Sequence, residues 1–209
     1  MGGARFGNRR NEKKGGEEMN EGRLTLKSIA GYCIDEALWK LAIDIASELQ
    51  EKKCYAAGID PDMVVIDNDE FHLVPKDNVM PEFCAPEGLA SETATVWSLG
   101  ALLCYASSGH LIFGGSGSLY QSKHPSVKLP VLQKKHSSLT PIVQRCLAYS
   151  PEKRISMDEL VIEARKGLEL CKKRIRSKSN VTVKKEHPVT ASLDERWPEE
   201  MIDNTILKL

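Results

Sequence analysis

Histidine and cysteine are the residues of this chain whose chemistry is most easily recognised from spacing, and their spacing indicates no site. The five histidines are scattered along the chain, at His72, His110, His124, His136 and His187. None lies near a serine or cysteine in a pattern typical of a catalytic triad. The six cysteines are also isolated, at Cys33, Cys54, Cys84, Cys104, Cys146 and Cys171. Because no Cys-x-x-Cys pair or Cys/His set has zinc-ligand spacing, we predict no metal site and no disulfide framework. We also predict no nucleophile and no cofactor. The histidines are expected to be exposed or hydrogen-bonded within the fold.

One glycine-rich stretch has a composition that can cradle phosphate groups. It reads Gly-Gly-Ser-Gly-Ser over residues 114–118. It lacks the Lys-Ser/Thr pair of a P-loop and the third glycine of a dinucleotide fingerprint. The surrounding span from Gly109 to Pro130 mixes Gly, Ser, Lys and His. This composition predicts a long loop with at most a short helix, and the glycine-rich stretch is expected to be its flexible part.

Two elements in the first half of the chain must position any site. Asp35 is suited to cap a helix that runs to Lys52, because apolar residues then repeat at helical spacing. This apolar face consists of Leu38, Leu41, Ala42, Ile45 and Leu49. Residues 63–66 are apolar and residues 71–74 are apolar except for His72. The two runs flank Asn68-Asp69, a pattern that predicts two short strands joined by a hairpin turn.

Three further helices are indicated in the second half. Residues 96–106 are apolar nearly all the way round, which is typical of a helix at the centre of a domain. Thr140-Pro141 is a favoured helix start, with Ile142, Val143, Cys146 and Leu147 as the apolar set. Residues 156–159 form a capping box before a last long helix. Its apolar stripe is Met157, Leu160, Val161, Ala164, Leu168, Cys171 and Ile175.

Three short segments, taken together and in this order, resemble the C-terminal lobe of protein kinases. They are residues 85–87 (Ala-Pro-Glu), 95–100 (Thr-Val-Trp-Ser-Leu-Gly) and 151–154 (Pro-Glu-Lys-Arg). In kinases the first closes the activation segment and the second begins the buried central helix. The third carries an arginine that pairs with the glutamate of the first. The resemblance therefore implies a buried structural ion pair between Glu87 and Arg154, the alternative being that both are ordinary surface charges.

The same resemblance extends over residues 61–67, which fall on the end of the kinase catalytic loop. The catalytic His-Arg-Asp triplet then falls on residues 56–58, which are Ala-Ala-Gly. The catalytic-loop lysine falls on Asp60 and the magnesium-binding asparagine on Met63. The Asp-Phe-Gly motif falls near residues 75–77, where Asp77 alone could be a stray metal ligand. The resemblance thus implies that the base and metal ligands for phosphoryl transfer are absent, so we expect no enzymatic activity.

Other parts of the kinase pattern are also missing. Thr95 stands where kinases place an aspartate that braces the catalytic loop; a threonine can still cap the central helix, but it cannot serve as that charged anchor. The span from Asp77 to Ala85 is too short for a regulated activation loop. Only 34 residues precede Asp35, so we expect no sheet-bearing N-lobe.

The expected fold class is mainly α: a kinase C-lobe-like helical domain with a minor β-hairpin and no N-lobe, over residues 22–176. Residues 1–21 are expected to be disordered and 177–191 to form a linker. The pattern resembles the kinase non-catalytic C-lobe (KIND) family, whose members bind short peptide segments. This implies a pseudokinase-derived, catalytically inactive scaffold module that binds a protein or peptide partner. A pseudokinase with residual nucleotide binding, or half of a split kinase, is the open alternative.

Residues 192–209 form a tail segment with an amphipathic pattern. Its apolar side chains recur at nearly helical spacing among acidic residues, at Trp197, Met201, Ile202 and Ile206. After a polar linker, such a segment is suited to dock into a groove of a partner. It could equally be a terminal helix that completes the core of the domain, and the pattern favours neither clearly.

The overall charge and hydropathy exclude several partner classes. Lysine plus arginine equals aspartate plus glutamate, at 29 each, so no field of the whole molecule points to nucleic acid or an anionic membrane. A basic run from Lys172 to Lys185 contains no aromatic residue that could stack on a base. No apolar run reaches the roughly 18 residues needed to cross a bilayer. We therefore expect a cytoplasmic protein whose partner is a protein, with no nucleic acid and no membrane.

Overall fold

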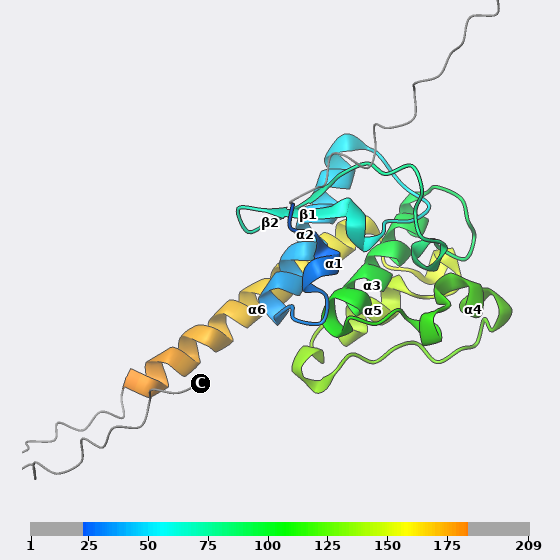
Figure 1. Cartoon of the computed structure of the whole chain (residues 1–209). Helices are drawn as coiled ribbons and strands as arrows, with labels where there is room; N and C mark the ends of the chain where they lie inside the picture. Colours follow the sequence, from blue (N-terminus) through cyan, green and yellow to red (C-terminus); the bar gives the residue numbers. More distant parts are fainter. Residues whose placement is uncertain (1–22, 184–209) are drawn as a thin grey trace, which may run out of the picture. The chain divides into compact units, whose positions relative to one another are not determined.

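The computed structural model describes residues 23–183, with side chains to Ser177. Its described part is mainly helical, with a single two-stranded antiparallel sheet. The elements are α1 (Leu26–Ile29), α2 (Asp35–Lys52), β1 (Val64–Asp67), β2 (Glu70–Leu73), α3 (Glu92–Ser108), α4 (Gly117–Lys123), α5 (Thr140–Cys146) and α6 (Met157–Val183), as labelled in Figure 1. Short 3-10 turns lie between them at residues 61–63, 81–83, 113–115, 134–136 and 151–153. The chain divides into two compact units, Met1–Arg174 and Ile175–Leu209.

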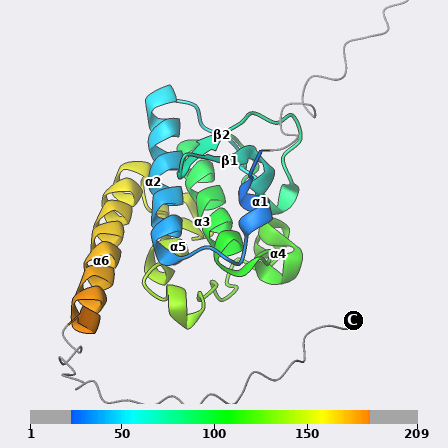
Figure 2. The ribbon, with the colours of Figure 1, turned by 60° about the vertical axis from the view of Figure 1, so that its left-hand side comes forward.

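Helix α3 is the centre of this unit, as its all-round apolar sequence predicts. It runs through the middle of the ribbon beside α2 in both Figure 1 and Figure 2. Its side chains are buried on every face, and Trp97 is fully inaccessible. The helix begins at Glu92, before the apolar run, because Ser91 caps it: the Ser91 hydroxyl accepts a hydrogen bond from the Ala94 amide at 3.0 Å.

Helix α2 has the predicted bounds and buries the predicted apolar face against α3. The prediction that Asp35 caps it is wrong. Asp35 is the first helical residue, and its carboxylate contacts the His136 ring at 2.5 Å and the Ser138 hydroxyl at 3.4 Å. A negative side chain still favours this end of the helix dipole, so the sequence signal located the helix start but not the partner of the residue.

The hairpin is confirmed. Strands β1 and β2 pair with Val64 opposite Leu73 and Asp67 opposite Glu70. Asn68 and Asp69 both have positive φ, as a two-residue type I′ turn requires. The outer edge of β2 faces α2, where Asp44 accepts a hydrogen bond from the Phe71 amide and Glu48 one from the Leu73 amide. These carboxylates occupy two edge amides that an additional strand would otherwise pair with.

The glycine-rich stretch is exposed at residues 114–116, but its last two residues form the start of the short helix α4. Gly117 begins α4 and is buried, together with Ser118. Gly117 has a φ of +49°, and a Cβ at this position would lie 2.1 Å from the Glu82 carbonyl oxygen. The glycine is therefore needed for a close approach of two backbone segments rather than for flexibility.

The ends of α5 and α6 also differ from expectation. Thr140 lies inside α5, and its hydroxyl accepts a hydrogen bond from the Leu132 amide at 3.2 Å instead of capping the helix. Ser156 does cap α6, by accepting from the Glu159 amide at 3.2 Å. Helix α6 continues to Val183, so the start of the predicted linker at 177–191 is helical. No glycine or proline interrupts the sequence between Ser177 and Val183, which explains why the polar composition does not end the helix.

In the described range 23–183, no helix combines the length and the apolar character that a membrane crossing requires.

Candidate functional site

Two hydroxyl groups of α3 hold the loop that the kinase resemblance places at the catalytic position. The Thr95 hydroxyl accepts a hydrogen bond from the Ala56 amide at 2.9 Å and lies 3.0 Å from the Ala56 carbonyl oxygen. One helical turn further on, the Ser98 hydroxyl accepts from the Ile59 amide at 2.6 Å and lies 3.2 Å from the Ile59 carbonyl oxygen. The loop backbone is therefore fixed to the buried central helix at both ends.

Thr95 has a role that the sequence did not indicate. Thr95 does not cap α3, since Ser91 does, and it does brace the loop backbone, through a neutral hydroxyl. A hydroxyl can accept from an amide and donate to a carbonyl, whereas an ionised carboxylate can only accept. Threonine therefore suits a position where its oxygen accepts from the Ala56 amide and its one proton is shared between the Ala56 carbonyl at 3.0 Å and the Ser91 carbonyl at 2.9 Å.

Gly58, at the position of the catalytic base in the kinase resemblance, has no room for a side chain. A Cβ there would lie 2.7 Å from the Cys84 sulfur and 3.0 Å from the Cys84 Cα. Gly58 and Cys84 also form an isolated antiparallel bridge. The loop at this point packs on the segment that precedes Glu87.

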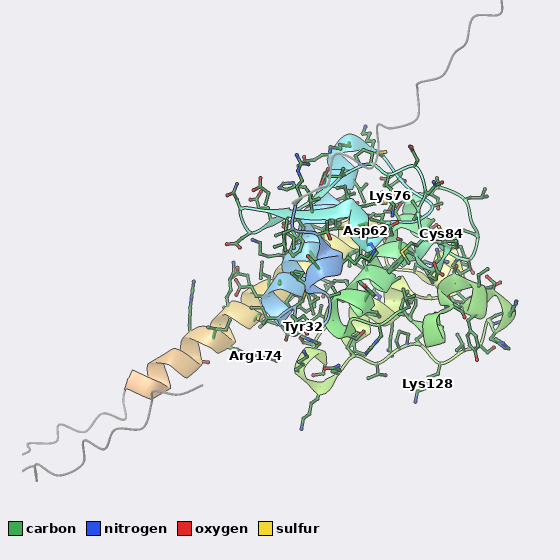
Figure 3. The ribbon with its side chains drawn as sticks, in the orientation of Figure 1. Tyr32, Asp62, Lys76, Cys84, Lys128 and Arg174 are labelled. Carbon is green, nitrogen blue, oxygen red and sulfur yellow. The ribbon has the colours of Figure 1, made fainter. Side chains whose placement is uncertain are left out.

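Asp60 is fully buried and its carboxylate is engaged on both oxygens. One oxygen accepts from the Asp62 amide at 3.0 Å, and the other accepts from the Lys76 ammonium at 3.0 Å and the Met80 amide at 3.2 Å. Burial lowers the pKa of Lys76, but its bonds to Asp60 and the charge of Asp62 outweigh this and leave that pKa above the ordinary value. Figure 3 shows Lys76 and Asp62 in the same region of the fold. The carboxylate of Asp60 thus serves to hold the chain together.

Metal-ligand clusters are not found within residues 23–183: no group of three or more His, Cys, Asp or Glu side chains there could hold a metal ion. Asp77, the stray ligand considered above, is exposed.

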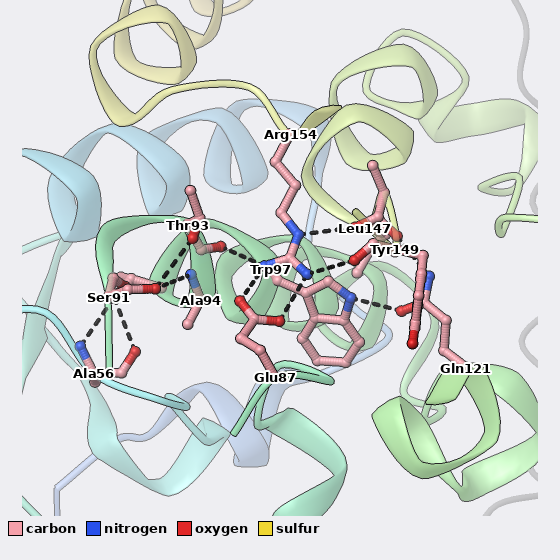
Figure 4. Close-up of polar contacts among 12 residues, drawn as sticks. Ala56, Glu87, Ser91, Thr93, Ala94, Trp97, Gln121, Leu147, Tyr149 and Arg154 are labelled. Carbon is pink, nitrogen blue, oxygen red and sulfur yellow. Dashed lines mark hydrogen bonds and ion pairs between the residues drawn. The ribbon is translucent and has the colours of Figure 1, made fainter. Parts of the chain in front are cut away.

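Glu87 and Arg154 meet, and the arginine uses all of its donors. Its two terminal nitrogens donate to the two Glu87 oxygens at 2.6 and 2.9 Å. The remaining three donors go to the backbone carbonyls of Ala148, Thr93 and Tyr149 at 2.8 to 3.0 Å. The guanidinium is fully buried, and Figure 4 shows it at the centre of these contacts. One cation therefore joins the 85–87 segment, the first turn of α3 and the chain before α6.

A second buried polar link was not expected from the sequence. The Trp97 indole donates to the Gln121 side-chain oxygen at 2.8 Å, and the Gln121 amide donates to the Leu147 carbonyl at 2.7 Å (Figure 4). Gln121 is fully buried and fixes α4 to the core. A single glutamine in a polar segment carries no sequence signal for burial. The only related signal is Trp97 itself, because the indole N–H of a buried tryptophan usually finds a hydrogen-bond acceptor.

Among the described histidines, His72, His110 and His124 are exposed. His136 is buried, with Nδ1 at 2.5 Å from Asp35 and no hydrogen-bond partner for Nε2 within the described chain. His187 lies outside the described residues.

The cysteines in the described residues are all free thiols. Burial raises the pKa of Cys104 and of Cys146 to about 12, so neither is a nucleophile at neutral pH.

The tail residues Trp197, Met201, Ile202 and Ile206 lie outside the described residues, so their role stays a prediction.

No protein-family model matches this chain, and no curated protein matches its sequence.

Replacing Thr95 with valine should destabilise the domain by about 1–3 kcal/mol, because the part-buried Ala56 amide loses its acceptor. The matched control is Thr93→Val, whose hydroxyl contacts only Ser91, at 3.1 Å, and which should cost less than about 1 kcal/mol. Urea unfolding of both variants gives the comparison. Equal, small effects would show that the hydroxyl of Thr95 does not hold the loop.

Proposed function

We propose that this domain is a non-catalytic interaction module derived from a protein kinase C-lobe, which binds a protein or peptide partner. The observation that supports it most is the set of contacts around Arg154. The guanidinium joins the 151–154 segment to Glu87 of the 85–87 segment. It also binds the backbone of Thr93, two residues before the 95–100 segment. A shared scaffold contact of this kind is what descent from a kinase lobe would leave in place.

The chemistry at the corresponding catalytic position supports a non-catalytic role. Gly58 offers no base, and its surroundings exclude even a Cβ without rearrangement. Asp60 and Lys76 are bonded to each other, so neither group is poised to accept a proton from a substrate hydroxyl. A general base must reach the proton it abstracts, and the described residues place none there.

The direct test is affinity capture of partners with the purified domain, followed by calorimetric titration of each captured protein in isolated form. We expect at least one partner that binds in a 1:1 complex without any nucleotide. If every captured protein fails to bind once purified, the interaction role is wrong.

We also predict that ATP with magnesium will not stabilise the domain. A ligand that binds only the folded state raises the Tm, and a ligand present at 100 times its Kd contributes about 2.7 kcal/mol. We therefore expect a Tm change of less than about 1 °C at millimolar ATP-magnesium, since no binding gives no such contribution. A rise of several degrees that disappears in an Asp60→Asn or Lys76→Met variant would instead support the pseudokinase alternative.

A further inference from the structure

The balanced net charge of the chain conceals a strong local asymmetry. Between Glu92 and Glu152 there is no aspartate or glutamate, and the basic residues in this interval are Lys123, Lys128, Lys134, Lys135 and Arg145. Arg145 is paired with Glu159 at 2.6 Å. The ammonium groups of the four lysines are exposed and make no ion pair or hydrogen bond to any described residue. This acid-free interval therefore presents positive charge to the solvent.

An apolar groove lies within this interval. It has a volume of about 230 Å³ and is formed by the end of α3, the loop after it and the extended segment 130–133. Cys104, Ile112 and Leu132 are its buried apolar residues, and its polar lining residues (Ser107, Ser108, His110 and Gln133) include no lysine, arginine, aspartate or glutamate. Pockets for drug-sized ligands have volumes of about 300–1,000 Å³, so this groove suits a single large side chain better than a small-molecule cofactor.

The groove is next to unusually exposed apolar side chains. Val131 lines it and is 65% exposed, while Tyr32 and Ile34 on the nearby loop are 87% and 64% exposed. The loop of Tyr32 packs on the end of α3, because the Gly31 amide donates to the Ala106 carbonyl at 2.9 Å. Figure 3 shows Tyr32 and Lys128 labelled on the lower side of the ribbon.

Two lysines directly follow the groove segment, at Lys134 and Lys135, and Lys128 precedes it. Lys135 is close enough to Cys33 for its charge to oppose the rise in the Cys33 pKa that burial causes. The carboxylate of Asp35, at the start of α2, contacts His136 and Ser138. We name this surface, made of Tyr32, Ile34, Val131, Lys128, Lys134 and Lys135 around the groove, the basic face.

We propose that the basic face binds an acidic peptide segment of the partner, with one large apolar side chain of that peptide inserted into the groove. This rests on the proposed function and names the chemistry of the partner. Carboxylates of the peptide would meet lysines that have no internal partner, so no existing ion pair has to be broken. In such interfaces a buried apolar anchor usually supplies most of the affinity, and the complementary charges around it supply specificity.

The test is selection of a random 12-residue peptide library on the full chain, followed by fluorescence titration of one enriched synthetic peptide. We expect enriched peptides to be rich in Asp and Glu around one Leu, Phe or Trp. Binding should weaken at least tenfold in Lys134→Glu/Lys135→Glu, and at least fivefold in Val131→Glu. The control Lys53→Glu/Lys173→Glu makes the same charge change at exposed positions outside the acid-free interval and should bind normally. Circular dichroism melting of each variant verifies the fold.

The outcomes separate the two proposals. Enriched peptides that are neutral or basic, or binding that is insensitive to the basic-face variants, would overturn this inference and leave the interaction role intact. The inference is equally wrong if a single-stranded RNA 20-mer binds the face more tightly than any peptide, or if the face variants abolish a dimer of the chain itself. If neither a peptide nor a purified partner binds the chain, both proposals fail.

Discussion

Replacing Glu87 with alanine is expected to destabilise the domain by about 3–5 kcal/mol, the range found when one member of a buried ion pair is removed. The Arg154 guanidinium is fully buried, so losing Glu87 leaves a cation in the interior with only three carbonyls as partners. The change should be large enough to be clear in denaturant unfolding monitored by circular dichroism.

A double-mutant cycle sharpens this prediction. Glu87→Gln combined with Arg154→Met should cost less than the sum of the two single changes by about 1–3 kcal/mol, as coupled residues do. The chain offers a matched control in Arg145 and Glu159, an arginine–glutamate pair with the same 2.6 Å separation but with both side chains nearly half exposed. The exposed pair should give a coupling below about 1 kcal/mol. Equal couplings in the two pairs would show that burial does not strengthen the Glu87 contact.

The same pair gives a pH dependence with a definite sign. Burial raises the pKa of Glu87, but the hydrogen bonds and charge of Arg154 outweigh it and hold that pKa below the ordinary value. A carboxyl whose pKa is lowered by folding stabilises the fold above its unfolded pKa, about 4.3, and loses this contribution as the pH falls through its folded pKa. The stability difference between the wild type and Glu87→Gln should therefore be constant near neutral pH and shrink in acid.

Gly117→Ala is expected to have the second large effect, of about 3 kcal/mol. The substitution adds a left-handed backbone strain of about 1–2 kcal/mol and an overpacking cost of at least about 1 kcal/mol, since the new Cβ would lie 2.1 Å from the Glu82 carbonyl oxygen. The matched control is Gly114→Ala in the same glycine-rich stretch. Gly114 has a φ of +68° but no atom within 4 Å of its Cβ position, so only the strain should appear.

The two glycine variants compare packing with flexibility in one segment. Denaturant unfolding should separate them by more than 1 kcal/mol. If both cost the same, the stretch does not pack on residues 81–83 as described, and the expectation of a flexible loop would be restored.

The elements that the sequence predicted well are those in which one local signal dominates. Helix α2 was predicted with its bounds because five apolar residues repeat on one face, and the hairpin because Asn68-Asp69 tolerates positive φ. The side chains of Asp35, Thr95 and Thr140 do not act as helix caps, for a common reason. Each side chain is suited to cap a helix, but each found a partner distant in the chain or in another loop. Propensity identifies a residue that can make a hydrogen bond and says nothing about which group will receive it.

The candidate site also contains features that no local sequence signal could predict. Glu87 and Arg154 are 67 positions apart, and only the kinase resemblance gave a reason to pair them. The burial of Gln121 and the fixed position of Gly117 depend on contacts with segments far along the chain, and no local pattern encodes them. The basic face was hidden for another reason: counting charges over the whole chain cancels an acidic first half against an acid-free interval.

We propose that this domain acts by binding and not by phosphoryl transfer. The most direct test is to incubate the purified chain with γ-labelled ATP, magnesium and a mixture of generic protein substrates. We predict no transferred label above a matched preparation carrying Asp60→Asn, Asp62→Asn and Asp77→Asn, because the proposed kinase resemblance places Gly58 and Met63, which can serve neither as base nor as metal ligand, at the positions of those groups. Label transfer that the wild-type chain supports and this triple variant loses would show that the chain itself catalyses the reaction, and would contradict the claim.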